Sequence, residues 1–354
     1  MEPKRATASI VVACRNEAGA IADLLRSISA QRMEGWEWDV IVADGRSEDG
    51  TQEILAEFCA CHSRFRMVDN EGLLVSTGLN RAIRKARGEY ILRMDARTEY
   101  DSTYCRTCLE ELTRHEADNA GGPARAVART RFGRAVAAAY HSRFSTGGAC
   151  FHDVDYEGWA ETVPYGCWRK STLEELGLFD EALVRNQDDE LNLRLVRAGG
   201  RIWQSPRIVS WYHPRETLRG LCAQYFQYGF WKVAVMRKHR MPASWRHVVA
   251  PLFVLSTVCA IVAAGVAAWL GQRELLLLAT AGLGLQWLAY LVALVAAAVL
   301  TAARSGWEHL PVLPVVFAVY HLSWGTGFLL GCWWLLGRPA RLNYKTSKFT
   351  EVNH

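Results

Sequence analysis

The chain has 354 residues, of which 50% are hydrophobic and 22% charged, and 41 Lys and Arg against 36 Asp and Glu give a net charge of +5. This composition excludes a disordered or low-complexity chain, and the length allows about two domains. The small positive charge suits phosphates or an anionic membrane surface, but it is too diffuse to indicate nucleic-acid binding.

The first hundred residues alternate between strand and helix patterns. Short apolar or β-branched runs predict strands, and amphipathic stretches between them predict helices. Such alternation implies an α/β fold with a mainly parallel sheet that helices cover on both faces. The predicted strands are 9–13, 39–43, 66–68 and 89–94, and the predicted helices are 20–31, 51–61 and 77–86.

Polar residues follow three of these strands, with Glu17 after the first, Asp44 after the second, and Asp95 and Arg97 after the fourth. Ligands of such sheets bind beyond the carboxyl ends of the strands. Carboxylates there can accept hydrogen bonds from a base and a ribose, or hold a hard cation. Each residue alone could belong to a turn or a helix start, but their coincidence at three strand ends favours a nucleotide site.

No glycine-rich phosphate loop accompanies these acids. The chain has no GxGxxG after the first strand and no GxxxxGK[ST] motif anywhere. Their absence from the sequence counts against a dinucleotide-dependent oxidoreductase and a P-loop NTPase. A nucleotide held through carboxylates and a metal remains.

Asp188, Asp189 and Glu190 begin a helix pattern that continues through Leu191 and Leu195. Acids at this place are also expected as helix caps and first-turn residues, because the helix dipole favours negative charge there. A positioned carboxylate can equally act as a general base.

Residues 217–237 predict a helix with aromatic side chains that include Tyr225 and Trp231, just before the bases Arg237 and Lys238. Aromatic residues beside bases suit the headgroup layer of a membrane, and a helix packed in a core is the alternative.

The chain then changes character, since residues 248–337 hold only four charged side chains. Three uncharged runs, 248–270, 275–303 and 310–337, each reach the roughly 20 residues needed to cross a bilayer. No secretory signal precedes the polar part, and bases flank the first run. We therefore expect a multi-pass protein of the plasma (inner) membrane with its N-terminal domain in the cytoplasm.

The tail complicates this topology, because its bases also favour the cytoplasm, which three full crossings would forbid. One run is therefore expected not to cross. The third is the candidate, since Pro311, Pro314, His321, Gly325 and Gly327 suit an irregular segment shielded by protein. The bases of the tail are Arg338, Arg341, Lys345 and Lys348.

Taken together, the motifs resemble the family-2 glycosyltransferases of the GT-A fold. SIVVACRNEAGAI is similar to the opening strand of that family, and VIVADGRSEDGT is similar to its strand followed by DGSSDGT. GLNRAIRKARGEYILRMDA resembles the approach to the metal-binding acids, VPYGCWRKSTLEELGLFDEAL the acceptor side, and NQDDELNLRL the helix of the catalytic base. YHPRETLRGLCAQYFQYGFWK and HLSWGTGFLLG resemble the ExoA-like membrane enzymes of succinoglycan and related exopolysaccharide assembly.

The resemblance implies an inverting transfer of a sugar from a nucleotide-sugar donor, a UDP-sugar, to a glycan carried on polyprenyl diphosphate. Other proteins of polysaccharide assembly would be further partners. The implied divisions are a catalytic domain over 1–215, an amphipathic interface region over 216–247, the membrane region over 248–337 and a basic tail over 338–354.

Roles carried over by the resemblance make Asp188 the general base and place Glu17 and Asp44 at the uracil and ribose. Asp95 would hold Mg²⁺ or Mn²⁺ at the diphosphate. Further donor contacts are implied for Ala13, Arg15, Asn80 and Arg215, and acceptor-side contacts for Gly166, Cys167, Gln224 and Trp231.

Arg97 departs from the family motif, which has a second metal ligand, Asp or sometimes His, at that place. Arginine is effectively always protonated and cannot ligate a cation. Either Asp95 holds the metal with a ligand from elsewhere, for which His213 is the candidate, or Arg97 partly replaces the metal as a phosphate partner. Arg215 could pair with the diphosphate oxygens bidentately. Gln187 is a second departure, since many relatives have Glu there.

Three other interpretations stay open at the level of sequence. The domain could be a catalytically degenerate binding or scaffold subunit of a polysaccharide assembly complex, although Asp188 is intact. A transporter with a soluble domain is disfavoured, because the runs contain neither acids nor repeats. A processive synthase is disfavoured because no QxxRW sequence follows Asp188.

Overall fold

The structure is a computed structural model, and it describes residues 6–240 and 246–336. Its contacts divide these residues into two compact units, each described here by itself. The first unit contains 6–126 and 149–213, and the second contains 127–148 together with 214–240 and 246–336. The bases of the tail, Arg338, Arg341, Lys345 and Lys348, lie outside the described residues.

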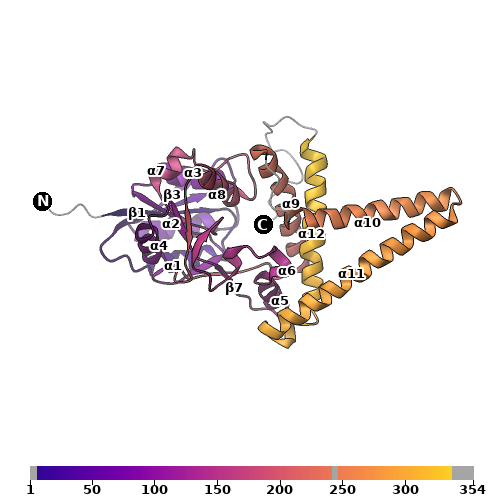
Figure 1. The fold of residues 1–354 in the computed structure, drawn as a ribbon. Helices are drawn as coiled ribbons and strands as arrows, with labels where there is room; N and C mark the ends of the chain where they lie inside the picture. The colour runs from indigo at the N-terminus through magenta and orange to yellow at the C-terminus, as the bar shows by residue number, and fades with distance from the viewer. Residues whose placement is uncertain (1–5, 241–245, 337–354) are drawn as a thin grey trace. The chain divides into compact units, whose positions relative to one another are not determined.

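An eight-stranded sheet in the order β3-β2-β1-β4-β9-β6-β10-β8 forms the centre of the first unit (Figure 1). The strands β1 to β4, β6 and β10 run in one direction, and β9 and β8 run against them. The mainly parallel sheet predicted from sequence is therefore confirmed. Its strands are β1 (Thr7–Cys14), β2 (Glu37–Asp44), β3 (Phe65–Asp69), β4 (Tyr90–Arg93), β6 (Asn119–Gly121), β8 (Gly158–Ala160), β9 (Cys167–Arg169) and β10 (Ile202–Gln204).

Helices cover both faces of this sheet because successive strand residues point to opposite sides. Ile10 and Val12 of β1 pack with the helices α1, α2 and α4, whereas Val11 packs with α3, α7 and α8. All three of these β1 side chains are fully buried. The helices are α1 (Ile21–Ser29), α2 (Thr51–Cys61), α3 (Val75–Lys85), α4 (Tyr104–Arg114), α7 (Lys170–Glu175) and α8 (Gln187–Arg197).

A second, three-stranded sheet lies in the same unit and was not predicted. Its central strand β11 (Ser210–Tyr212) pairs antiparallel with β5 (Thr98–Tyr100) and parallel with β7 (Ala124–Ala126). This pairing brings the chain before His213 back to the segment that directly follows Asp95.

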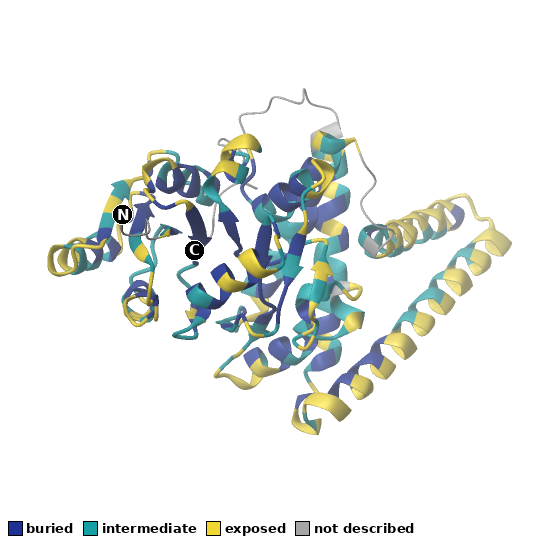
Figure 2. Cartoon of the chain, turned by 60° about the vertical axis from the view of Figure 1, so that its left-hand side comes forward, coloured by how far each residue is buried: buried dark blue, intermediate teal, exposed yellow. Residues whose placement is uncertain are grey.

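The second unit is helical and contains three helices that are long and apolar enough to cross a membrane: His247–Trp269, Arg273–Ser305 and Leu313–Trp334. Large apolar side chains along α10 and α11 are exposed (Figure 2), as expected for surfaces that face lipid. The described helices of this unit are α5 (Arg131–Tyr140), α6 (Arg143–Thr146), α9 (Leu218–His239), α10 (Arg246–Trp269), α11 (Arg273–Ser305) and α12 (Leu313–Leu336), with short 3₁₀ turns at Cys150–His152 in the first unit and Trp307–His309 in the second.

The expectation of an irregular third apolar segment is wrong, because α12 is one continuous helix. Pro311 precedes it and Pro314 lies in its first turn, where a missing backbone N–H costs no hydrogen bond. Its glycines instead permit close packing against α9. A Cβ atom at Gly327 would meet the carbonyl oxygen of Phe226, and one at Gly229 of α9 would meet that of Trp324.

The segment 127–148 interrupts the sequence of the first unit but packs in the second. Val136 and Ala139 of α5 are buried with Phe317 of α12, and the Tyr320 hydroxyl donates to the Val136 carbonyl at 3.3 Å. No pattern within this segment places it beside the apolar helices, because its partners lie about 180 residues later.

Candidate active site

The turns after β1 and β2 are tied to each other. The backbone N–H of Asn16 donates to Ser47 Oγ at 2.8 Å, and that of Glu17 donates to Thr51 Oγ1 at 2.9 Å. In return Asn16 Oδ1 accepts from the Glu48 N–H at 2.9 Å. Asn16 has a φ of 52°, a left-handed conformation that Asn tolerates better than most residues. The two strand ends therefore present their polar residues as one framework.

Asp44 ends β2 and is only 3% exposed. Its oxygens accept hydrogen bonds from Ser47 Oγ at 2.5 Å and from the Ser47 N–H at 3.0 Å. Burial and the Asp44 charge raise the pKa of the neighbouring Cys14 thiol well above its usual range, so this cysteine stays neutral. The Asp44 carboxylate is thus fixed at the edge where a ribose contact was predicted.

Arg97 forms an ion pair with Glu17. Its Nε atom lies 3.1 and 3.0 Å from the two carboxylate oxygens of Glu17. Glu17 follows β1 and Arg97 follows β4, and these two strands are adjacent in the sheet. The predicted convergence of the first and fourth strand ends is therefore visible in a direct ion pair.

Arg93, which was not singled out from sequence, lies between two of the predicted carboxylates. Its Nε and Nη2 atoms donate to Asp95 Oδ1 and Oδ2 at 2.8 and 2.9 Å, and its Nη1 atom lies 3.6 Å from Asp188 Oδ2. The residue is 3% exposed. A charged residue inside the apolar strand YILR, two positions before Asp95, was the available signal.

Electrostatics keep this guanidinium charged. Burial alone would lower the pKa of Arg93, but the Asp95 and Asp188 carboxylates outweigh that effect and raise it. Burial and the Asp95 charge raise the pKa of Tyr100 well above its usual range, and its hydroxyl accepts a hydrogen bond from the Asp95 backbone N–H at 2.7 Å. Arg93 is thus a permanent cation held beside two acids.

Asp188 lies in the first turn of α8, after Asn186, whose φ of 60° turns the chain into the helix. Its side chain is 34% exposed, so it has both a buried side towards Arg93 and an accessible side. Gln187 beside it is 6% exposed, and its Oε1 is buried with no hydrogen-bond partner among the described residues.

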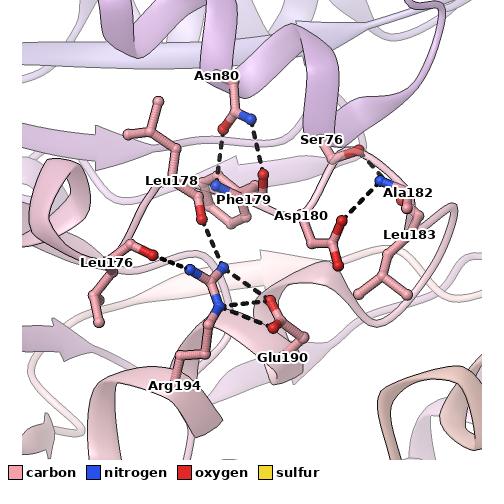
Figure 3. A network of polar contacts seen from close by, with 10 residues as sticks. All are labelled: Ser76, Asn80, Leu176, Leu178, Phe179, Asp180, Ala182, Leu183, Glu190 and Arg194. Atoms are coloured by element: carbon pink, nitrogen blue, oxygen red, sulfur yellow. Dashed lines mark hydrogen bonds and ion pairs between the residues drawn. The ribbon is translucent and has the colours of Figure 1, made fainter. Parts of the chain in front are cut away.

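The segment 176–183, on the predicted acceptor side, is clamped by α3 and α8 (Figure 3). Asn80 of α3 accepts from the Phe179 N–H at 2.9 Å and donates to the Phe179 carbonyl at 2.8 Å. Arg194 donates to the carbonyls of Leu176 and Leu178 while it pairs with the buried Glu190. Asn80 is 1% exposed, so in this structure its amide positions a loop, and the donor contact implied for it stays a prediction.

The proposed metal ligands already have protein partners. Asp95 pairs with Arg93, and His213 Nε2 lies 2.9 Å from Glu99 Oε1. Within 6–240 and 246–336, no three or more His, Cys, Asp or Glu side chains form a group that could hold a metal ion. Asp95 is 34% exposed, and carboxylate oxygens have two lone pairs each. The Asp95 oxygens therefore keep lone pairs beside their bonds to Arg93, and Asp95 is the one of the two predicted ligands that lies at a strand end of the main sheet.

The other predicted site residues of the first unit lie in or next to the strands β1 and β9. Gly166 has a φ of 105° and accepts the Arg93 backbone N–H at 3.1 Å through its carbonyl. Cys167 is fully buried in the core, and burial raises its pKa well above the usual range. Ala13 packs beside α3. Arg15 lies over Gly45, and its Nε is buried without a hydrogen-bond partner in the described part of the chain.

Arg215, Gln224 and Trp231 belong to the second unit. Arg215 is partly exposed, Gln224 donates to the Tyr228 hydroxyl at 3.0 Å, and Trp231 is fully buried. The donor role of the first and the acceptor roles of the other two stay predictions.

Comparison with known proteins gives the same class of enzyme as the fold and the acids at the strand ends. Residues 9–167 match the family model described as glycosyl transferase family 2. The chain is 30% identical over 322 residues to the succinoglycan biosynthesis protein ExoA of Rhizobium meliloti (strain 1021), covering 90% of this chain and 93% of that protein. The protein therefore belongs to glycosyl transferase family 2, and it is a glycosyltransferase.

One further enzyme is similar in sequence and one solved structure is similar in fold. The dolichyl N-acetyl-alpha-D-glucosaminyl phosphate 3-beta-D-2,3-diacetamido-2,3-dideoxy-beta-D-glucuronosyltransferase of Methanococcus voltae is 24% identical, covering 71% of this chain and 80% of that enzyme. The solved structure of the mannosyltransferase PcManGT from Pyrobaculum calidifontis, in complex with GDP-Man and Mn²⁺, aligns with a TM-score of 0.55 at 18% identity, covering 89% and 86% of the two chains. This similarity shows the GT-A fold.

Proposed function

We propose that the protein transfers a sugar, with inversion, from a UDP-sugar to a glycan linked to polyprenyl diphosphate during exopolysaccharide assembly. The observation that carries the proposal is the convergence of Glu17, Asp95 and Asp188 on the arginines Arg97 and Arg93. The relatives named for succinoglycan synthesis and for a dolichyl-phosphate-linked sugar support an acceptor carried on a lipid.

In the proposed reaction Asp188 removes the proton from the acceptor hydroxyl. The acceptor oxygen then attacks the anomeric carbon as the bond from that carbon to the diphosphate oxygen breaks. The transition state has oxocarbenium character, and UDP departs with the electron pair of the broken bond. Asp188 lies at the start of α8 with about a third of its side chain exposed. The exposed side can meet an acceptor while Arg93 contacts the other side.

The donor end uses the strand-end residues. Glu17 and Asp44 are the proposed contacts for the uracil and ribose, and Arg97 offers a cation near the phosphates. Asp95 is the residue that would hold Mg²⁺ or Mn²⁺, which when bound would neutralise charge on the diphosphate. The donor phosphates would have to supply further ligands, because Asp95 is a single carboxylate.

The second unit is proposed to anchor the enzyme in the plasma membrane with the catalytic residues on the cytoplasmic side. We propose that α10 and α11 cross as a hairpin and that α12 stays at the membrane surface with α9. The glycine contacts align α9 and α12 in parallel, with Phe226 beside Gly327 and Phe230 beside Gly331. The uncharged stretch of α9 between Arg219 and Lys232 spans only about 18 Å, too short to cross beside α12.

A donor screen tests the proposed function. The purified full chain is incubated with single UDP-sugars and a lipid-linked acceptor pool, and products are read by mass. One hexose or N-acetylhexosamine added to a lipid-linked glycan is the expected result. UDP binding without transfer from any donor would support the degenerate scaffold subunit instead.

A further inference from the structure

We propose that Arg93 is a positioning residue that fixes the donor-side carboxylate of Asp95 and the acceptor-side carboxylate of Asp188 on one guanidinium group. The inference rests on the proposed function, which gives those two carboxylates their roles. It adds a residue that contacts neither sugar nor nucleotide in the proposed reaction but sets where both acids lie.

The geometry assigns separate edges of the guanidinium to the two acids. The edge formed by Nε and Nη2 makes two parallel hydrogen bonds to Asp95, at 2.8 and 2.9 Å. Nη1 is buried without a hydrogen-bond partner among described residues, and it faces Asp188 Oδ2 at 3.6 Å. A bidentate pair fixes orientation as well as distance, so the plane of Arg93 defines the position of the Asp95 carboxylate. Asp188 makes no hydrogen bond to Arg93, and charge attraction at 3.6 Å holds it on the opposite edge of the guanidinium.

The surroundings keep Arg93 itself in place. It ends β4, which lies between β1 and β9 in the middle of the sheet. The Phe179 ring lies 5.9 Å from the guanidinium carbon, and Phe179 is in turn held through its backbone by Asn80. A functional group supported by a rigid strand and a clamped neighbour can be held to a fraction of an ångström.

Charge explains why an arginine serves here and a lysine would not. Two carboxylates at one site repel each other, and a cation between them removes that repulsion. Arginine offers five N–H donors in a planar fork, whereas lysine is a point charge on a flexible stem. Lysine at position 93 would keep the charge but lose the simultaneous alignment of Asp95 and Asp188.

The competing explanation is an ion pair that only stabilises the sheet. Arg66 and Asp39 supply such a pair in the same unit, with Nη2 2.5 Å from Oδ2, and Asp39 lies near the start of β2, away from the strand ends that carry the site. Arg66→Met is therefore the control for loss of a first-unit ion pair, and the unfolding temperature accounts for the deeper burial of Arg93, whose side chain is 4% exposed against 35% for Arg66.

The test uses the full chain in detergent and measures UDP affinity with Mn²⁺ present, transfer turnover and unfolding temperature. Arg93→Met should weaken UDP binding about tenfold and lower turnover about 100-fold, because misplacing catalytic groups by about 1 Å has effects of that size. Arg93→Lys should recover about tenfold of the lost turnover. Arg66→Met should leave affinity and turnover within about twofold.

A double-mutant cycle separates positioning from general stability. If Arg93 acts on the donor through Asp95, Arg93→Met should change UDP affinity less than about twofold in an Asp95→Asn background. Additive effects of the two substitutions, or turnover of Arg93→Met within about threefold of the unmodified enzyme, would overturn the inference. If Arg93→Met does not fold, unimpaired turnover in Arg93→Lys would also overturn the inference.

The outcome also separates this inference from the proposed function. An unmodified enzyme that transfers sugar while Arg93→Met behaves like Arg66→Met contradicts the positioning role alone. An unmodified enzyme that transfers from no donor contradicts the proposed function, and the UDP-binding cycle then still decides whether Arg93 acts through Asp95.

Discussion

Arg97 and Glu17 form an ion pair across two neighbouring strand ends, with Nε of Arg97 within 3.1 Å of both Glu17 oxygens. Arg97 occupies the place where the family motif has a second metal ligand. The pair leaves Glu17 only 16% exposed, whereas Arg97 remains 37% exposed. Arg97 has two further guanidinium nitrogens beside Nε, and with more than a third of its side chain exposed we expect it to meet a phosphate while it keeps the contact to Glu17.

Replacement of Arg97 by Ala should therefore weaken UDP binding about tenfold, the loss expected for a charge-assisted phosphate contact of about 1.4 kcal/mol. Arg46→Ala is the matched control, because Arg46 follows β2 and pairs with Asp69 at the surface. Isothermal titration with UDP measures both. Equal affinities of the two variants would remove Arg97 from the donor site.

Chelation tests whether a metal ion or Arg97 neutralises the diphosphate. EDTA should reduce transfer by the unmodified enzyme at least about tenfold, and Mn²⁺ should restore it. In Asp95→Asn the added Mn²⁺ should fail to restore transfer, since the one proposed protein ligand is gone. Full activity in EDTA would instead assign the neutralisation of the diphosphate to Arg97.

Asp188→Asn should lower transfer by about 10³-fold, because the amide cannot accept the acceptor proton. UDP affinity should change little, since the side chain of Asp188 is proposed to face the acceptor. Asp189→Asn, one position along α8, is the control and should retain most of the activity. Transfer by Asp188→Asn at the rate of the unmodified enzyme would show that the base lies elsewhere.

Asn80→Ala tests the clamp on the segment 176–183. The substitution leaves the buried N–H and carbonyl of Phe179 without their partner, at a cost of about 2 kcal/mol and about 4–8 °C in unfolding temperature. UDP affinity should fall by much less than in Arg93→Met, because Asn80 acts on Arg93 only through Phe179, as measured by titration of the folded variant. A loss of UDP affinity without loss of stability would favour the donor contact implied for Asn80.

Membrane topology can be read by labelling and by a terminal reporter. A cysteine at the exposed Gln272, between α10 and α11, should react with an impermeant maleimide in intact cells. The native exposed Cys61 of the first unit should react only after permeabilisation. A reporter fused after His354 should signal from the cytoplasm, and an external signal would show that α12 crosses.

Local sequence patterns were sufficient for most elements of the first unit and for the three apolar helices. The helix 51–61 was predicted to the residue, and the strands 9–13 and 39–43 were each extended by a few residues in the structure. Such patterns depend on periodicity within one segment. They gave the ends of β1, β2 and β4, and with them the positions of Glu17, Asp44 and Asp95.

The unpredicted features all depend on partners distant in sequence. The sequence shows Arg93 only as a charged residue in an apolar strand. Its role becomes apparent when the fold brings Asp188, 95 positions later, beside it. The burial of α5 depends on Phe317 and Tyr320, which no pattern within 127–148 can reveal. The prolines and glycines of the third apolar run suggested irregular backbone. The alternative use of the glycines, close contact with α9, depends on the matching residues of another helix.

The contact between α9 and α12 also predicts which residues cannot be replaced by larger ones. At Gly229 and Gly327 the two backbones touch, so even a methyl group would force the helices apart. Harmful alleles should thus cluster at two glycines that take no part in the chemistry. Their phenotype should be loss of the protein from the cell, with catalysis in the surviving molecules unaltered.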